Sequence, residues 1–130
     1  MSCAAPREGA SKLHRSVLEA VKLAYPLQRI EQEKAVKVST PAGVRTLYFD
    51  ISLPGMRLEI ECQGRQHDEP VTFFHRGKAG FERSRSNDEI KRRWCRENGH
   101  FLVEIPDGVK LTGASFKKMV DKAIKIQSKE

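Results

Sequence analysis

The sequence predicts an α/β domain in which helices flank a mixed β-sheet, in the order α-β-β-β-α-β-α. Three observations predict this class. Stretches with helical periodicity stand near both ends of the chain, and β-type stretches follow one another between residues 28 and 63. A polar helical stretch then precedes a short apolar strand at residues 100–105. A hairpin-rich start followed by a helical crossover is typical of a mixed sheet between helices.

The first helix is expected over residues 11–25, because apolar residues recur there at helical spacing. Ser11 can cap its N-terminus, and Pro26 ends it. The segment before this helix, residues 1–10, contains Pro, Gly and Ala and is expected to be a flexible tail. Residues 11–130 are then expected to form a single domain, because the chain is too short for two.

Three strands are expected at residues 28–38, 44–53 and 57–63. The second is rich in β-branched and aromatic residues, and the Pro-Gly pair at 54–55 makes a tight turn into the third. The second and third strands should therefore form a hairpin.

Polar residues alternate with apolar ones along the third strand, so Glu59, Glu61 and Gln63 share one face. Across the hairpin, Asp50 can lie near Glu61. Two carboxylates, a backbone carbonyl and waters suit Mg²⁺, and close like charges repel each other unless a cation neutralises them. The alternative is that these carboxylates simply face solvent.

A long loop is expected at residues 64–80, and so long a loop in a small domain favours a functional role. It is followed by a polar helix at 81–98, the strand at 100–105 and an amphipathic helix at 113–127.

The net charge of +7 is unevenly distributed along the chain. Residues 41–74 carry a net charge of −2, whereas residues 75–100 carry +4. The excess of positive charge indicates an anionic partner such as nucleic acid. The local reversal indicates a metal-binding carboxylate cluster framed by a phosphate-binding surface, although chance variation on a solvated surface is the simpler alternative.

Several classes of protein are not expected. No apolar run approaches the roughly 18 residues that span a bilayer, and the N-terminus lacks the apolar segment of a secretory signal. The expected location is therefore cytoplasmic. The cysteines, of which there are 3, are too widely spaced for a disulfide framework or a paired zinc knuckle.

Two stretches stand out: Tyr-Phe-Asp at residues 48–50, and Leu-Glu-Ile-Glu-Cys-Gln-Gly-Arg-Gln-His at residues 58–67. Together they resemble small PD-(D/E)XK nucleases close to the very-short-patch-repair endonucleases. The pattern of those enzymes is an FD strand, a turn and an apolar strand ending in I-E-x-(D/Q)-G-x-Q-H. The resemblance covers about residues 11–106 and includes the D-x-x-K run at residues 88–91. It implies a restriction-endonuclease-like fold and hydrolysis of DNA phosphodiester bonds that depends on Mg²⁺ or Mn²⁺.

By position, the resemblance implies that Asp50 and Glu61 are metal ligands and that the backbone of Cys62 supplies a further oxygen. Gln63 stands where many of these enzymes have the lysine that orients the attacking water, but Gln63 cannot supply its positive charge. His67 is the nearest candidate for general acid–base catalysis, because imidazole titrates in the useful range; alternatively, it orders the loop.

Two further positions remain open. Lys91 on the following helix can bring its ammonium group into the site, or it can lie on a solvated helix face. The first helix of these nucleases often contributes an acidic residue, and His14 stands at the expected position, with Glu19 more than a turn later.

The predicted partner is DNA, held through its phosphates by basic residues that position it without reading sequence. The expected activity is cleavage of branched, junction or mismatched DNA, or site-specific nicking, by a homodimer if both strands are cut. The competing expectation is a non-catalytic nucleic-acid-binding module with a degenerate nuclease fold. The basic residues predicted to contact DNA are Arg65, Arg76, Lys78, Arg83, Arg85 and Arg92.

Overall fold

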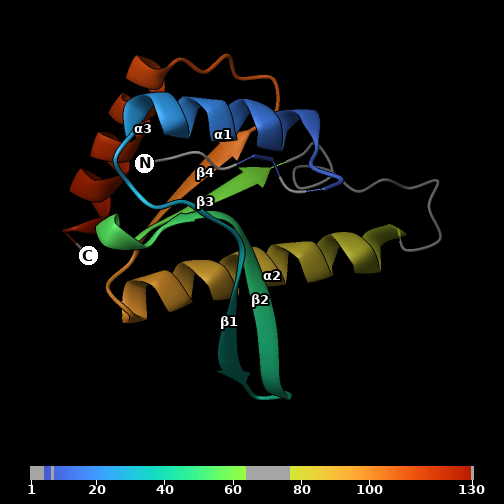
Figure 1. Ribbon diagram of the computed structural model, residues 1–130. Helices are drawn as coiled ribbons and strands as arrows, with labels where there is room; N and C mark the ends of the chain where they lie inside the picture. The colour runs from blue at the N-terminus through green and yellow to red at the C-terminus, as the bar shows by residue number, and fades with distance from the viewer. Residues whose placement is uncertain (1–4, 7, 64–76, 130) are drawn as a thin grey trace.

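The computed structural model describes residues 5–6, 8–63 and 77–129, with the side chains of residues 77–86 left outside the description. The predicted α/β class and the predicted order of elements are both confirmed (Figure 1). Along the chain, the elements are α1 (Lys12–Ala24), β1 (Glu31–Thr40), β2 (Gly43–Leu53), a short 3-10 helix (Pro54–Met56), β3 (Leu58–Gln63), α2 (Gly77–Glu97), β4 (Phe101–Pro106) and α3 (Gly113–Gln127).

In the described part of the chain, the strands form one open sheet of four strands in the order β1-β2-β3-β4. The pairs β1–β2 and β2–β3 are antiparallel, whereas β3 and β4 are parallel. A parallel pair requires a crossover, and α2 provides it. The sheet is therefore mixed. No helix in the described ranges combines the length and apolar character needed to cross a bilayer.

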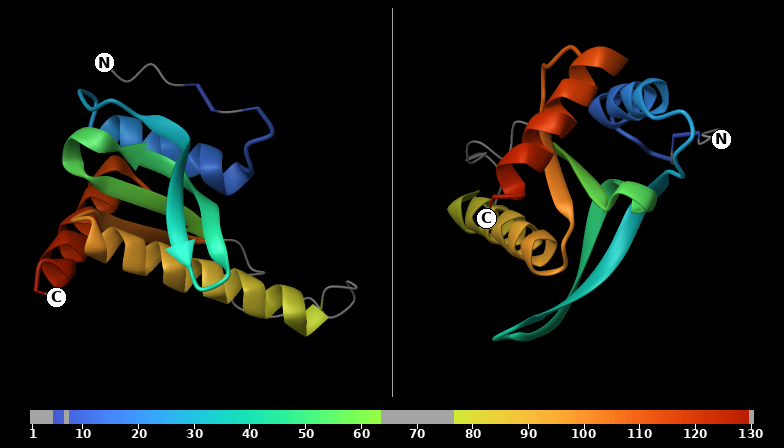
Figure 2. Two further views of the ribbon diagram at one scale, coloured as in Figure 1. Left: turned by 90° about the horizontal axis from the view of Figure 1, so that it is seen from below. Right: turned by 90° about the vertical axis from the view of Figure 1, so that its left-hand side faces the viewer.

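The helices lie on both faces of the sheet (Figures 1 and 2). α1 and α3 pack together on one face, where Val17, Val21 and Phe116 join the apolar side chains of β3 in the larger core cluster. α2 covers the other face, and the smaller cluster there includes Cys95 and Leu102. The β1–β2 hairpin extends beyond β3 and β4 as a long arm beside α2 (Figures 1 and 2).

Local sequence signals explain both helix starts on the α1–α3 face. The Ser11 hydroxyl accepts the backbone N–H of His14 at 3.0 Å, as the predicted cap requires. At the start of α3, Thr112 and Ser115 form a reciprocal capping box.

At Asp50, the apolar side chains of strand β2 switch from one face of the sheet to the other. Phe49 belongs to the α2-side cluster, whereas Ile51 belongs to the α1–α3 cluster. Alternate residues of a regular strand point to the same face, so the backbone must be irregular between these two residues. Glu33, opposite Asp50 on β1, has a positive φ of 52°. Asp50 therefore lies at a bend of the hairpin.

Two predicted boundaries were wrong. β1 covers residues 31–40 rather than 28–38, because the hairpin pairing continues up to Thr40 opposite Gly43. α2 begins at Gly77 rather than at residue 81, so the last four residues of the predicted loop are helical. Two glycines in those residues have low intrinsic helix propensity, and the context of a long helix overrides it.

Candidate active site

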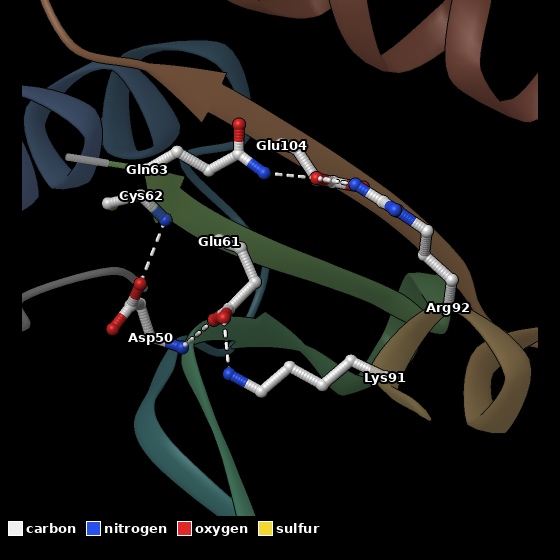
Figure 3. A network of polar contacts seen from close by, with 7 residues as sticks. All are labelled: Asp50, Glu61, Cys62, Gln63, Lys91, Arg92 and Glu104. Carbon is white, nitrogen blue, oxygen red and sulfur yellow. Dashed lines mark hydrogen bonds and ion pairs between the residues drawn. The ribbon is translucent and has the colours of Figure 1, made fainter. Parts of the chain in front are cut away.

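Asp50 and Glu61 lie side by side on β2 and β3 (Figure 3). The backbone N–H of Asp50 donates to Oε2 of Glu61 at 2.9 Å, and the backbone N–H of Cys62 donates to Oδ2 of Asp50 at 2.8 Å. Each carboxylate is thus held by the backbone of the opposite strand. The predicted proximity of these two carboxylates is present, and it coincides with the bend in β2.

Lys91 reaches this pair from α2. Its Nζ donates to Oε1 of Glu61, and the two side chains are only 15% and 11% exposed. The Nζ also lies 5.7 Å from the centroid of the Phe49 ring. Of the two alternatives for Lys91, the structure therefore shows the first: its ammonium group lies at the carboxylates and not on a solvated helix face.

The electrostatics of the pair are unfavourable for two negative charges. Burial and then the charge of Asp50 raise the pKa of Glu61 to about 7, although Lys91 and the Asp50 N–H act in the opposite direction. A divalent cation between the carboxylates would remove this repulsion.

Gln63 takes part in a neighbouring group of polar contacts on the same face (Figure 3). Its Nε2 donates to Oε2 of Glu104, a residue of β4 that stands directly beside Glu61 in the parallel register. Two guanidinium nitrogens of Arg92, Nε and Nη2, donate to the two oxygens of the same carboxylate at 2.6 and 2.7 Å. Arg92, predicted to contact DNA, is thus also an internal ion-pair partner.

Sequence reasoning missed Glu104. The only signal was a single charged residue within the otherwise apolar run Phe-Leu-Val-Glu-Ile at 101–105. A charge in so short a strand needs a compensating partner when it is partly buried, and Arg92 supplies it.

The oxygen atoms of the pair fit the predicted cation. Mg²⁺ prefers oxygen ligands, keeps several of its waters, and needs only one or two carboxylates from a protein. Asp50 and Glu61 provide these. The Cys62 N–H faces β2, so its carbonyl, which points the same way in an extended strand, faces β2 as well. Among the described residues, however, His, Cys, Asp and Glu form no group of three or more that could hold a metal.

The two candidates on α1 have other polar partners. His14 is buried, and its Nε2 lies 2.9 Å from Oε1 of Gln32. Glu19 is exposed and pairs with Lys22 at 3.3 Å. Among the described residues, neither makes a hydrogen bond or an ion pair with Asp50 or Glu61.

The remaining predicted site residues lie wholly or in part outside the described structure. His67, Arg65 and Arg76 lie outside the described residues. The backbone positions of Lys78, Arg83 and Arg85 lie on α2, but their side chains are outside the description.

Three known proteins that are similar to this chain are uncharacterized viral proteins. The chain is 39% identical over 72 residues to the uncharacterized protein 033L of Invertebrate iridescent virus 3, and 38% identical over 68 residues to the uncharacterized protein 307L of Invertebrate iridescent virus 6. It is 33% identical over 84 residues to the uncharacterized protein 094L of Frog virus 3 (isolate Goorha).

These matches cover 55%, 52% and 64% of this chain and 37%, 34% and 54% of the three relatives. The chain thus spans about a third to a half of the length of the curated relatives it matches. No family model and no solved structure matches it.

Proposed function

We propose that this chain is an endonuclease that hydrolyses DNA phosphodiester bonds with Mg²⁺ or Mn²⁺ held by Asp50 and Glu61. The observation that carries the proposal is the side-by-side placement of these carboxylates, fixed through the backbone of the opposite strand and with Lys91 beside them. Such an arrangement is costly for a purely structural role, because burial and mutual repulsion both disfavour two negative charges.

The cation would activate a water molecule and neutralise the charge that develops on the phosphodiester. Asp50 and Glu61 would bind it, and the Cys62 carbonyl would add a third oxygen. Other side chains would orient the attacking water molecule and stabilise the charge on the phosphate.

Lys91 would supply the positive charge that Gln63 lacks. The Gln63 amide nitrogen is engaged with Glu104, and the amide oxygen points away from that contact (Figure 3). In this orientation Gln63 offers an acceptor, which can orient a water molecule but cannot stabilise a phosphate. The Lys91 ammonium lies at Glu61 and is the nearest described cation to the two carboxylates. His67 remains the proposed general acid or base.

The proposed substrate is DNA, because the stretch that forms α2 and the segment before it carries the largest local excess of positive charge. Branched, junction or mismatched DNA is the proposed substrate class, with site-specific nicking as the variant. A homodimer is proposed if both strands are cut.

The test is cleavage of labelled linear, mismatched and four-way DNA in the presence of Mg²⁺, Mn²⁺ or EDTA. We expect cleavage that depends on the metal, and its loss in Asp50→Asn and Glu61→Gln with DNA binding retained. Glu19→Gln is the matched control, because this carboxylate is exposed and lies away from the pair. Cleavage that survives both site substitutions would refute the assignment.

A specific observation favours the non-catalytic alternative. Lys91 already neutralises part of the charge of Glu61 without a metal, as a structural ion pair would. DNA binding without cleavage of any substrate, under either metal, would favour this second function.

A further inference from the structure

A pocket of about 440 Å³ lies where the last turns of α2 and α3 meet strand β4. Its polar lining includes Arg92, Arg96, His100 and Glu104, and its apolar lining includes Phe101 and Ile126. This volume and this mixture of apolar walls with a few polar groups are typical of a site for a small molecule.

The orientation of His100 is fixed by a buried carboxylate. Its Nδ1 lies 3.0 Å from Oε2 of Glu59, a side chain that is fully buried and also faces Lys34 at 3.5 Å. This contact engages Nδ1 and leaves the opposite ring nitrogen, Nε2, for a ligand. The Trp94 ring, with its centroid 4.8 Å from that of His100, packs against the imidazole and helps to hold it.

The arginines give the pocket a surplus of positive charge. Arg92 is paired with Glu104, whereas Arg96 is exposed and makes no ion pair or hydrogen bond with any residue that the structure describes. The carboxyl ends of α2 and α3 both lie here, and their free carbonyls repel anions. A bound anion must therefore be held by the side chains.

We propose that this pocket binds a phosphomonoester of the kind carried at the 5′ end of a nucleotide. The guanidinium of Arg96 offers paired donors that match phosphate oxygens, and His100 adds a second polar group to the pocket lining. Phe101 and Ile126 form an apolar wall for the attached nucleoside. The inference does not depend on the proposed nuclease activity, because Asp50, Glu61 and Lys91 do not line the pocket.

The test is calorimetric titration of the full chain, in EDTA, with inorganic phosphate, deoxyadenosine 5′-monophosphate, a DNA duplex carrying a 5′-phosphate and the same duplex without that phosphate. The matched variants are Arg96→Ala and Arg15→Ala; both side chains are exposed, and only Arg96 lines the pocket. We expect the mononucleotide or the phosphorylated duplex to bind the wild-type chain, and Arg96→Ala to weaken that binding about tenfold. Arg15→Ala should leave it unchanged.

A comparison of the mononucleotide with the two duplexes identifies whether the phosphate belongs to a free nucleotide or to a DNA end. Binding of the mononucleotide alone would identify a free nucleotide, and tighter binding of the phosphorylated than of the unphosphorylated duplex would identify a DNA end. In both cases the His100 ring nitrogen signals should shift in an NMR titration. Equal affinity in the two arginine variants, or no binding of any probe by the wild-type chain, would overturn the proposal. Since EDTA prevents metal-dependent cleavage, this result is separate from the cleavage test.

Discussion

The two faces of strand β3 are buried by different means. On one face, Leu58 and Ile60 pack against α1 and α3 in an apolar core. On the other, Glu59 and Glu61 are also buried, but their neighbours are His100 and Lys91. Burying apolar surface stabilises a fold, whereas burying a carboxylate costs free energy that a partner only partly returns.

The two faces of β3 therefore contribute differently to the stability of the fold and to the placement of charged side chains. The α1–α3 face holds the larger apolar cluster and supplies most of the hydrophobic stabilisation. The α2 face places charged groups in fixed positions at some cost in stability, as expected where a site is built for function. Substitutions on the two faces should therefore have different signatures.

The largest effect is expected on the apolar face. Ile60→Ala should lower the free energy of unfolding by about 2–5 kcal/mol, because it leaves a cavity in the main cluster. Urea denaturation measures this loss. Leu23→Ala, on the exposed side of α1, is the control and should change stability by less than about 0.5 kcal/mol. Similar losses in the two variants would show that this face is not the main source of stability.

The second effect is a pH dependence on the polar face. The pKa of Glu61 is raised from 4.5 to about 7 by folding, so between these values the folded chain holds a proton that the unfolded chain has released. Stability must then fall as the pH rises through this window. In EDTA, Glu61→Gln should gain about 3 kcal/mol over the wild-type chain between about pH 4 and about pH 8.

The control for this pH profile is Glu19→Gln, whose carboxylate is exposed. Its unfolding free energy should follow that of the wild-type chain across the whole range. A stability difference between Glu61→Gln and the wild-type chain that does not change with pH would contradict the burial of Glu61 beside a second negative charge.

The smallest effect is expected at Lys91. Lys91→Met leaves Glu61 without its cationic partner, and this should cost about 1–2 kcal/mol at about pH 8. The loss is limited because Glu61 can take up a proton instead, at about 1.4 kcal/mol for each pH unit above its pKa of about 7. The loss should shrink at about pH 5, where Glu61 takes up a proton. Chemical denaturation at the two pH values gives the comparison, with the exposed Lys122→Met as the reference. A loss that is the same at both pH values would point to packing rather than charge.

The sequence was informative wherever a short-range pattern determines the structure. Alternation in residues 58–63 predicted both faces of β3, and the Pro-Gly turn at 54–55 predicted the hairpin that brings Asp50 to Glu61. Lys91 could be proposed for the site because the resemblance included its D-x-x-K run. These features depend on residues close together in the chain.

The sequence was less informative where distant segments meet. The contacts of Glu104 with Gln63 and Arg92 depend on the parallel register of β3 and β4, which no local pattern encodes. The bend at Asp50, opposite the positive φ of Glu33, is likewise a property of the paired strands. The Glu59–His100 contact joins residues 41 positions apart.

The most direct test of the central claim is calorimetric titration of the chain with Mn²⁺, comparing the wild type with Asp50→Asn and with the control Glu19→Gln. If Asp50 and Glu61 form a cation site, the wild type and the control should bind one ion with equal affinity. Asp50→Asn should weaken binding at least about tenfold, because a charged oxygen ligand is lost. Equal affinity in all three proteins, or no binding by the wild type, would contradict the claim.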